Sequence, residues 1–452
     1  MTAGPDTDAL RAAGFPEGEV RARARTGTAA VFPHPGTYGR DLFGAHAPER
    51  TAGPAGADPL DHARLVPPVF MPQRLEKLIE LGREPVHDDV DLRTDIGGFA
   101  SALPLFLSAF GSTRAGSGDL AVAASAQAAR LGIPMVLGEN MVPVHGYGAA
   151  SDDGHAAGAL TARIRAYADA SDGASGGVVV QQSTQDADAE VWNLLYSDPA
   201  VLPLVESGRL GFELKIGQGA KPGLGGMTVV DGAEAGRLSD AFTVQDVFAA
   251  DGPARLRCAT PGTFTEEIVR QQVRFMRNNF PRARVWVKLP PGRDVALAAR
   301  TAWQAGADAV TVDGAEGGTG WAPRAFLDQV GLPLAECLRR IGTPEGCLLV
   351  TGRFHEGGRT VRALASGARA AGLGRAALLA VDEDREHGLV RLARSIALEC
   401  RLLISALGKY APAALTADDV WWPDTAAAPA ATPAPAPAAP APAAARRAGG
   451  AA

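Results

Sequence analysis

The chain has 452 residues and a formal net charge of −6, with 46% hydrophobic and 21% charged residues. This composition is ordinary for a globular protein with one large domain or two smaller ones. The acidic balance argues against a general nucleic-acid or anionic-membrane surface, because both need a basic excess, so small molecules and other proteins are the expected partners.

The two ends of the chain are expected to lie outside the packed core. Residues 1–60 are rich in Ala, Gly, Pro and charge, with little to anchor a core, and predict a loosely ordered N-terminal arm. Apolar residues at helical spacing towards the end of 65–81 predict a short helix packed on the main body. Residues 423–452 are rich in Ala and Pro, and predict a disordered, partly polyproline tail.

Between these ends, eight short apolar runs alternate with helical patterns. The runs are typical of strands that are buried on both faces. Strands are expected over residues 104–110, 133–139, 177–182, 211–216, 285–289, 309–313, 347–351 and 370–374. Helices are expected over residues 117–131, 160–170, 187–195, 265–279, 294–305, 323–340, 359–367 and 385–407. Eight successive strand–helix units predict a (β/α)8 TIM barrel over residues 61–422, in preference to an open doubly wound sheet.

One connection is too long for an ordinary loop. It follows the fourth strand and covers residues 217–263. Loops of this length are usually functional, so we expect a binding segment or a lid. Sites of such barrels lie at the carboxyl ends of the strands, which is where this insertion begins.

A polar, glycine-rich stretch begins this insertion. The apolar run that starts at Phe212 meets five glycines and a proline, so the backbone leaves the sheet where Lys215, Gln218 and Lys221 project. Two ammonium groups, an amide and exposed backbone N–H groups suit an anionic cofactor or a dicarboxylate. The alternative is an ordinary Gly-rich loop.

Three segments resemble one known family. Glu213-Leu-Lys-Ile-Gly-Gln-Gly-Ala-Lys-Pro-Gly223 resembles the E-I-K-x-x-Q-G-A-K-P-G signature of the FMN-binding synthase domain of glutamate synthases and of the related subunit of methylamine-glutamate N-methyltransferase. Asp313-Gly-Ala-Glu-Gly-Gly-Thr-Gly320 resembles the G-x-D-G-G-T-G segment of that family, and Thr351-Gly352 with Gly372-Leu-Gly-Arg375 resembles its two phosphate-binding turns. The resemblance implies an FMN-binding (β/α)8 barrel.

The resemblance also implies which residues hold the flavin. Its phosphate would lie on the loops after the seventh and eighth strands, and Arg353 stands where the family has a second glycine. The alternative for the two phosphate-binding loops is that they are simply tight turns. For Lys288 the alternative is a core ion pair, and for Gln181 it is a buried amide with satisfied hydrogen bonds. The implied cofactor-binding residues are Ser108, Ala109, Gly111, Gln181, Lys215, Lys288, Gly318, Thr319, Gly352, Arg353, Gly374 and Arg375.

The catalytic residues are likewise implied by the resemblance. Gly138-Glu139-Asn140 resembles the family's G-E-G-G segment, so Glu139 is the candidate for proton transfer, with a helix cap or a salt bridge as its alternative. Lys215, Gln218 and Lys221 would bind a substrate carboxylate. Trp321 stands where the family usually has a small residue, and would narrow the pocket.

The chain departs from full-length glutamate synthases in its cysteines. Met1 opens a short arm in place of a nucleophilic cysteine, so no glutamine hydrolysis is expected. Residues 379–388 correspond to the family's iron–sulfur loop but contain no cysteine, and Cys400 alone cannot ligate a cluster. The scattered cysteines predict neither a metal site nor disulfides, and they favour a cytoplasmic protein. No apolar run reaches the roughly 18 residues that cross a bilayer.

The function expected from the resemblance is reduction of an imine of a 2-oxo acid to an amino acid at the flavin. No Rossmann fingerprint for NADPH is found, so electrons would come from directly bound nicotinamide, a partner protein or the substrate. The alternatives are a flavin oxidase or dehydrogenase for another amino-acid-like compound, and a subunit that binds a ligand or partner without redox turnover. A separate electron-donor or ammonia-supplying protein and a homo-oligomer stay open.

Overall fold

The computed structural model describes twelve stretches of the chain, and every statement below refers to them. They are residues 14–36, 58–110, 118–138, 155–183, 190–219, 228–232, 235–236, 239, 243–247, 254–257, 263–317 and 322–423.

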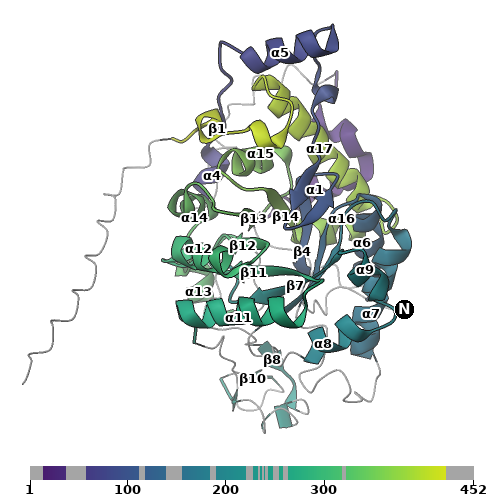
Figure 1. The fold of residues 1–452 in the computed structure, drawn as a ribbon, viewed down its shortest axis with the longest axis vertical. Helices are drawn as coiled ribbons and strands as arrows, with labels where there is room; N and C mark the ends of the chain where they lie inside the picture. The colour runs from purple at the N-terminus through teal and green to yellow at the C-terminus, as the bar shows by residue number, and fades with distance from the viewer. Residues whose placement is uncertain are drawn as a thin grey trace, which may run out of the picture.

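Eight parallel strands close into a barrel at the centre of the protein. They are β4 (Leu105–Phe110), β5 (Met135–Leu137), β6 (Val178–Ser183), β7 (Leu210–Lys215), β11 (Arg284–Leu289), β12 (Ala309–Asp313), β13 (Cys347–Thr351) and β14 (Ala370–Leu373). Neighbours in the ring follow chain order, and β14 pairs with β4 to close it. Helices surround these strands (Figure 1). The predicted (β/α)8 barrel is confirmed, and every predicted strand overlaps an observed one.

The surrounding helices agree with the predictions in most positions. They are α6 (Gly118–Arg130), α7 (His155–Ala170), α8 (Glu190–Ser197), α9 (Leu202–Glu206), α11 (Glu266–Asn279), α12 (Val295–Ala305), α13 (Arg324–Gln329), α14 (Leu334–Ile341), α15 (Gly357–Ala365), α16 (Arg375–Glu383) and α17 (Gly388–Ala406). The single helix expected over 323–340 is two helices, because Gly331 adopts a positive φ and Pro333 cannot continue a helix. Helix α16 was not predicted, because its successive buried residues, 376–381, form a short apolar run that does not by itself distinguish a helix from a strand.

A hairpin closes the amino end of the barrel. It consists of β2 (Thr94–Ile96) and β3 (Phe99–Ser101), and Ile96 and Phe99 pack with Trp286 inside the ring. The indole N–H of Trp286 donates to the carbonyl of Gly97 at 3.0 Å. A Cβ at Gly97 would lie 2.4 Å from that nitrogen, so the close approach requires glycine. This apolar plug leaves the carboxyl end of the barrel for a site.

The N-terminal segment contains a helix that differs from the loosely ordered arm expected over residues 1–60. In α1 (Glu17–Thr26), Val20 and Ala24 are fully buried in the main core. Arg21 pairs with Asp382 at 2.8 Å, and Arg23 pairs with Glu399 at 2.7 Å. The sequence did not predict a packed helix here, because α1 buries two small apolar residues and is anchored largely through charged contacts. The expected tail from residue 424 onward lies outside the described residues.

The helix expected near residues 65–81 is present as α5 (Pro72–Leu81), but the expectation that it packs on the main body is wrong. No residue of α5 is buried, and Leu75 and Ile79 are 58% and 70% exposed. The helix is attached instead through polar contacts such as that of Arg74 with the Tyr410 hydroxyl at 3.1 Å. No helix in the described stretches is long and apolar enough to cross a membrane.

The long insertion after the fourth barrel strand carries a small sheet of its own. Strands β8 (Thr228–Val230), β10 (Arg255–Arg257) and β9 (Val244–Gln245) pair in that order, antiparallel to one another. The sheet lies beyond α11 at the bottom of Figure 1. A role as a lid stays a prediction.

Candidate functional site

Buried polar side chains fill the carboxyl half of the barrel. Inward-facing residues recur every second position along a strand. The inward residues nearer the amino end are apolar, as in Val179 and Trp286. The inward residues nearer the carboxyl ends of the strands are polar and at most 7% exposed. A buried polar group is costly unless it has partners or a ligand, so this layer marks a candidate site. Its members are Gln181, Ser183, Glu213, Lys215, Lys288, Thr311, Asp313 and Thr351.

Glu213 connects three strands within this layer. It accepts a hydrogen bond from the side-chain amide of Gln181 on β6 and another, at 3.0 Å, from the Thr311 hydroxyl on β12. Burial raises the pKa of Glu213, and the charge of Lys288 with the two hydrogen bonds opposes that shift. The amide of Gln181 is therefore held in place beside the ammonium groups.

Two lysines lie side by side at the carboxyl end. The strand register pairs Lys215 of β7 with Lys288 of β11. The Lys288 Nζ lies 3.2 Å from the Asp313 Oδ2 on β12, and both side chains are buried. The same Asp313 oxygen accepts the N–H of Gly219 at 3.2 Å, so it also contacts the glycine-rich stretch after β7.

Strands β13 and β14 end in turns whose backbone can face a ligand. Gly352 has φ 140°, and the following Arg353 has φ 57°, the one positive φ outside glycine among the described residues. Gly374 stands at the N-cap of α16, and a Cβ built there would meet no atom within 4 Å. The buried Thr351 Oγ1 makes no hydrogen bond within the described stretches. An unsatisfied hydroxyl and an open glycine fit a ligand that carries acceptor oxygens.

The arginines of these two turns differ in their surroundings. Arg353 donates from Nη2 to the carbonyl of Gly14, and its guanidinium lies 6.0 Å from the Phe15 ring centre. It therefore contacts the N-terminal segment. Arg375 is half-buried at the start of α16, and burial lowers its pKa against the charge of Glu17.

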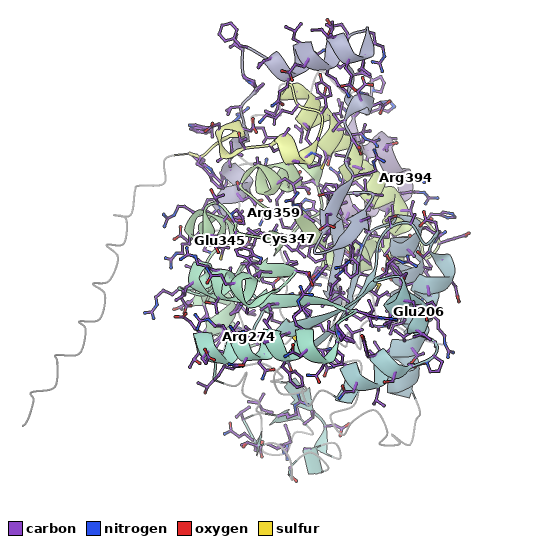
Figure 2. The ribbon with its side chains drawn as sticks, in the orientation of Figure 1. Glu206, Arg274, Glu345, Cys347, Arg359 and Arg394 are labelled. Carbon is purple, nitrogen blue, oxygen red and sulfur yellow. The ribbon has the colours of Figure 1, made fainter. Side chains whose placement is uncertain are left out.

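A buried ion cluster supports the turn after β13. Arg359 of α15, labelled in Figure 2, is 1% exposed and donates from Nε to the carbonyl of Gly352 at 2.9 Å. Its Nη2 contacts Glu316 at 2.6 Å and Asp58 at 2.7 Å, and its Nη1 contacts Asp61. Burial, followed by the charge of Asp58, raises the pKa of Glu316 to about 8, although Arg359 opposes the shift.

The structure places the described members of the predicted site on one end of the barrel. Gln181, Lys215 and Lys288 share the buried polar layer, and Gln218 follows β7 closely. Lys288 forms a buried ion pair and Gln181 a buried hydrogen bond, which are the contacts that a purely structural role would also give them. These two contacts therefore fit both a structural and a ligand-binding role. Ser108 and Ala109 lie on β4, and Ala109 packs against the apolar cluster inside the barrel. The predicted residues outside the described stretches are Gly111, Glu139, Lys221, Gly318, Thr319 and Trp321.

Sequence reasoning gave no role to Glu213, Thr311, Asp313 or Thr351. A signal for most of them was present, since polar residues stand two apart at the end of otherwise apolar strands, as in Glu213 with Lys215 and Thr311 with Asp313. A spacing of two puts both side chains on the same face of a strand. That spacing predicts a polar barrel interior without any resemblance.

Comparison with known proteins identifies the family. The family described as "Conserved region in glutamate synthase" matches residues 141–385, which is more than half of the chain. An archaeal-type glutamate synthase [NADPH] of Dehalococcoides mccartyi is 30% identical over 186 residues, covering 39% of this chain and 36% of that protein. A glutamate synthase large subunit-like protein of Rhizobium meliloti is 30% identical over 187 residues, covering 39% of this chain and 40% of that protein. The matches thus cover well under half of either relative.

Solved structures support the fold. An (S)-mandelate dehydrogenase superposes with a TM-score of 0.51 at 18% identity, covering 90% of this chain and 99% of that one. A mandelate oxidase mutant with a monooxide FMN adduct gives 0.51 at 17% identity, covering 93% and 96%. At this identity the likeness shows a shared barrel fold alone. With the family match over residues 141–385, the chain belongs to the glutamate synthase family.

Proposed function

We propose that the chain is an FMN-dependent oxidoreductase that reduces an imine of a 2-oxo acid to an amino acid. The observation that carries the proposal is the pair of buried lysines, Lys215 and Lys288, at the carboxyl end of the barrel in a member of the glutamate synthase family. A bound FMN would supply two-electron chemistry at its N5. Buried ammonium groups stabilise negative charge better than exposed ones, because little water screens them.

The turns after β13 and β14 would hold the flavin phosphate. Backbone N–H groups near Gly352 and Gly374 lie at the positions that bind phosphate in barrels of this type, and Gly374 precedes the nine-residue helix α16. The buried Thr351 hydroxyl would gain a partner there. Arg375 would add a cation at the same helix start.

The glycine-rich stretch after β7 would bind the substrate. Lys215, Gln218 and Lys221 offer two ammonium groups and an amide for a carboxylate, and charge-assisted hydrogen bonds of this kind are strong. Glu139 would transfer the proton to the reacting nitrogen. The roles of Glu139 and Lys221 rest on the family resemblance, because both lie outside the described residues.

The electron donor and the nitrogen source belong to the same proposal. Curated relatives carry NADPH in their names, so we propose NADPH as the donor and ammonium as the nitrogen source. A partner protein is the second possible donor. The reaction would take place in the cytoplasm, in keeping with three described cysteines that are unpaired, two of them buried.

A two-step spectroscopic experiment tests the proposal. The full chain is loaded with FMN, reduced anaerobically with NADPH or dithionite, and mixed with 2-oxoglutarate, ammonium or both. We expect the flavin bands to return only with both compounds present, and glutamate to form in equal amount. Anaerobic bleaching of the oxidised flavin by an amino acid, followed by return of the bands and formation of peroxide when oxygen is admitted, would favour an oxidase instead. A chain that takes up no FMN would favour a binding subunit.

A further inference from the structure

Asp313 occupies an unusual place between two parts of the candidate site. It ends β12, is 3% exposed, and carries one carboxylate oxygen that serves two donors. The Oδ2 atom lies 3.2 Å from the Lys288 ammonium and accepts the Gly219 N–H at 3.2 Å. The Lys288 donor belongs to barrel strand β11, and the Gly219 donor belongs to the stretch after β7 that carries Gln218.

Three titratable side chains of the described stretches surround Lys288. Lys288 faces Asp313 on β12 and the buried Glu213 on β7, and its register neighbour is Lys215. Of the two acidic side chains, Asp313 is the one that forms an ion pair with Lys288, since burial raises the pKa of Glu213 and favours its neutral form. Removal of the Asp313 charge makes this layer more positive. The effect on the negative charge of a reduced flavin is large, because little water screens it.

The loop contact has a separate consequence. Gly219 has φ 37°, a conformation that glycine adopts more readily than other residues, and its N–H is directed at Asp313. A buried N–H without an acceptor is costly, so this hydrogen bond favours one path for the backbone after β7. Gln218 stands immediately before the anchored N–H.

We propose that Asp313 is a positioning residue with two separable effects: its charge offsets Lys288 and lowers the reduction potential of the bound flavin, and its hydrogen bond to Gly219 orders the substrate-binding stretch. The proposal rests on the proposed function, because it assumes that FMN binds at this end of the barrel. It adds to that function the control of the flavin's reduction potential by a residue beside Lys288.

Two substitutions at this position separate the effects. Asp313→Asn removes the charge and keeps an oxygen that can accept the Gly219 N–H, whereas Asp313→Ala removes both. The matched control is Asp308→Asn at the opposite end of the same strand. Asp308 likewise serves one cation and one backbone N–H, since it contacts Arg277 at 2.7 Å and accepts the Val285 N–H at 2.7 Å.

Each variant of the full chain is loaded with FMN and measured in two ways that do not depend on turnover. Titration with sulfite, which adds to electron-poor flavins, and reductive titration against a reference dye report the reduction potential. A difference spectrum with 2-oxoglutarate reports substrate binding. The variant Lys288→Met, alone and combined with Asp313→Asn, tests whether the charge effect passes through Lys288.

We expect Asp313→Asn to raise the equilibrium constant for two-electron reduction on the order of tenfold, equivalent to about 30 mV, and to tighten sulfite binding in proportion. Asp313→Ala should share this shift and also weaken 2-oxoglutarate binding, whereas Asp308→Asn should change neither. The effect of Asp313→Asn should shrink when Lys288 is Met. Unchanged potential and sulfite affinity in a flavin-loaded Asp313→Asn variant would overturn the inference, while failure of the unsubstituted chain to bind FMN would overturn the proposed function instead.

Discussion

Buried charges surround the candidate site at the scale of single residues. Arg359, Glu316 and Asp58 form one cluster behind the turn after β13, and Lys288 and Asp313 form a second pair. Burying an ion pair seldom stabilises a fold more than apolar packing would. Both groups of charges lie next to the strand ends where we propose that the ligand binds, and binding would account for their position.

The raised pKa of Glu316 predicts a pH-dependent stability. The folded chain holds this proton up to about pH 8, whereas an unfolded glutamate releases it near 4.5, so stability falls as pH rises between these values. One fully retained proton gives a slope of about 1.4 kcal/mol per pH unit. We expect Glu316→Gln to flatten the urea-unfolding free energy between about pH 5 and pH 8 relative to the unsubstituted chain.

The control for this measurement is Glu336→Gln. Arg339 and Arg340 lower the pKa of Glu336 to about 2, against burial, so its contribution is lost only in more acidic solution. Glu336→Gln should therefore leave the dependence of the unfolding free energy on pH unchanged above about pH 5. An equal slope in the unsubstituted chain and in Glu316→Gln would contradict the account of the buried cluster.

Removal of Arg359 should be costly. Arg359→Met leaves the buried carboxylate of Asp58 without its cation and the side chain of Glu316 without its donor, and breaking a buried pair in this way costs about 3–5 kcal/mol. Arg339→Met, which removes the 66%-exposed partner of Glu336, should cost about 1 kcal/mol or less. Denaturant unfolding of both variants gives the comparison, and similar losses would show that the Arg359 cluster adds little.

At the scale of elements, close helix packing positions the turns that face the site. Helix α17 begins directly against α16, and a Cβ at Gly388 would lie 1.8 Å from the Ala380 carbonyl oxygen. Because that oxygen belongs to the backbone, the two helices would have to separate. Helix α16 begins at the proposed phosphate site, so this packing also fixes one wall of the site.

A pair of glycine substitutions tests this packing. Gly388→Ala should destabilise the chain by roughly 1–3 kcal/mol or more through overpacking. Gly18→Ala in α1 meets no atom within 4 Å and should stabilise by about 0.5–1 kcal/mol through helix propensity. Thermal unfolding distinguishes the two, and a neutral Gly388→Ala would mean that α16 and α17 can separate without cost.

The barrel strands were predictable from the sequence, whereas contacts between distant strands were not. The eight barrel strands were found because continuous apolar runs are typical of strands covered on both faces. Helix α16 was not predicted because a short apolar run, 376–381, fits a buried helix as well as a strand. The exposure of α5 was not predicted because an apolar stripe does not show whether a partner covers it. The pairing of Glu213 with Thr311 depends on barrel register, which the local pattern does not contain.

At the scale of the whole molecule, the barrel has one apolar end and one polar end. The hairpin of β2 and β3 plugs the amino end around Trp286, and the buried lysines and glycine turns lie at the other. The family match covers residues 141–385, which include six of the eight barrel strands but begin after β4 and β5. The remaining strands complete the ring, so the site depends on the whole barrel.

The most direct test of the account is a titration of the purified full chain with FMN and, separately, with riboflavin, followed by the flavin's fluorescence. The account predicts one FMN bound per chain. Riboflavin should bind at least about tenfold more weakly, because it lacks the phosphate that the turns near Gly352 and Gly374 would hold through charge-assisted hydrogen bonds. Equal affinity for both flavins would contradict the proposed phosphate site. If neither flavin shows saturable binding, the claim that the barrel binds FMN is contradicted.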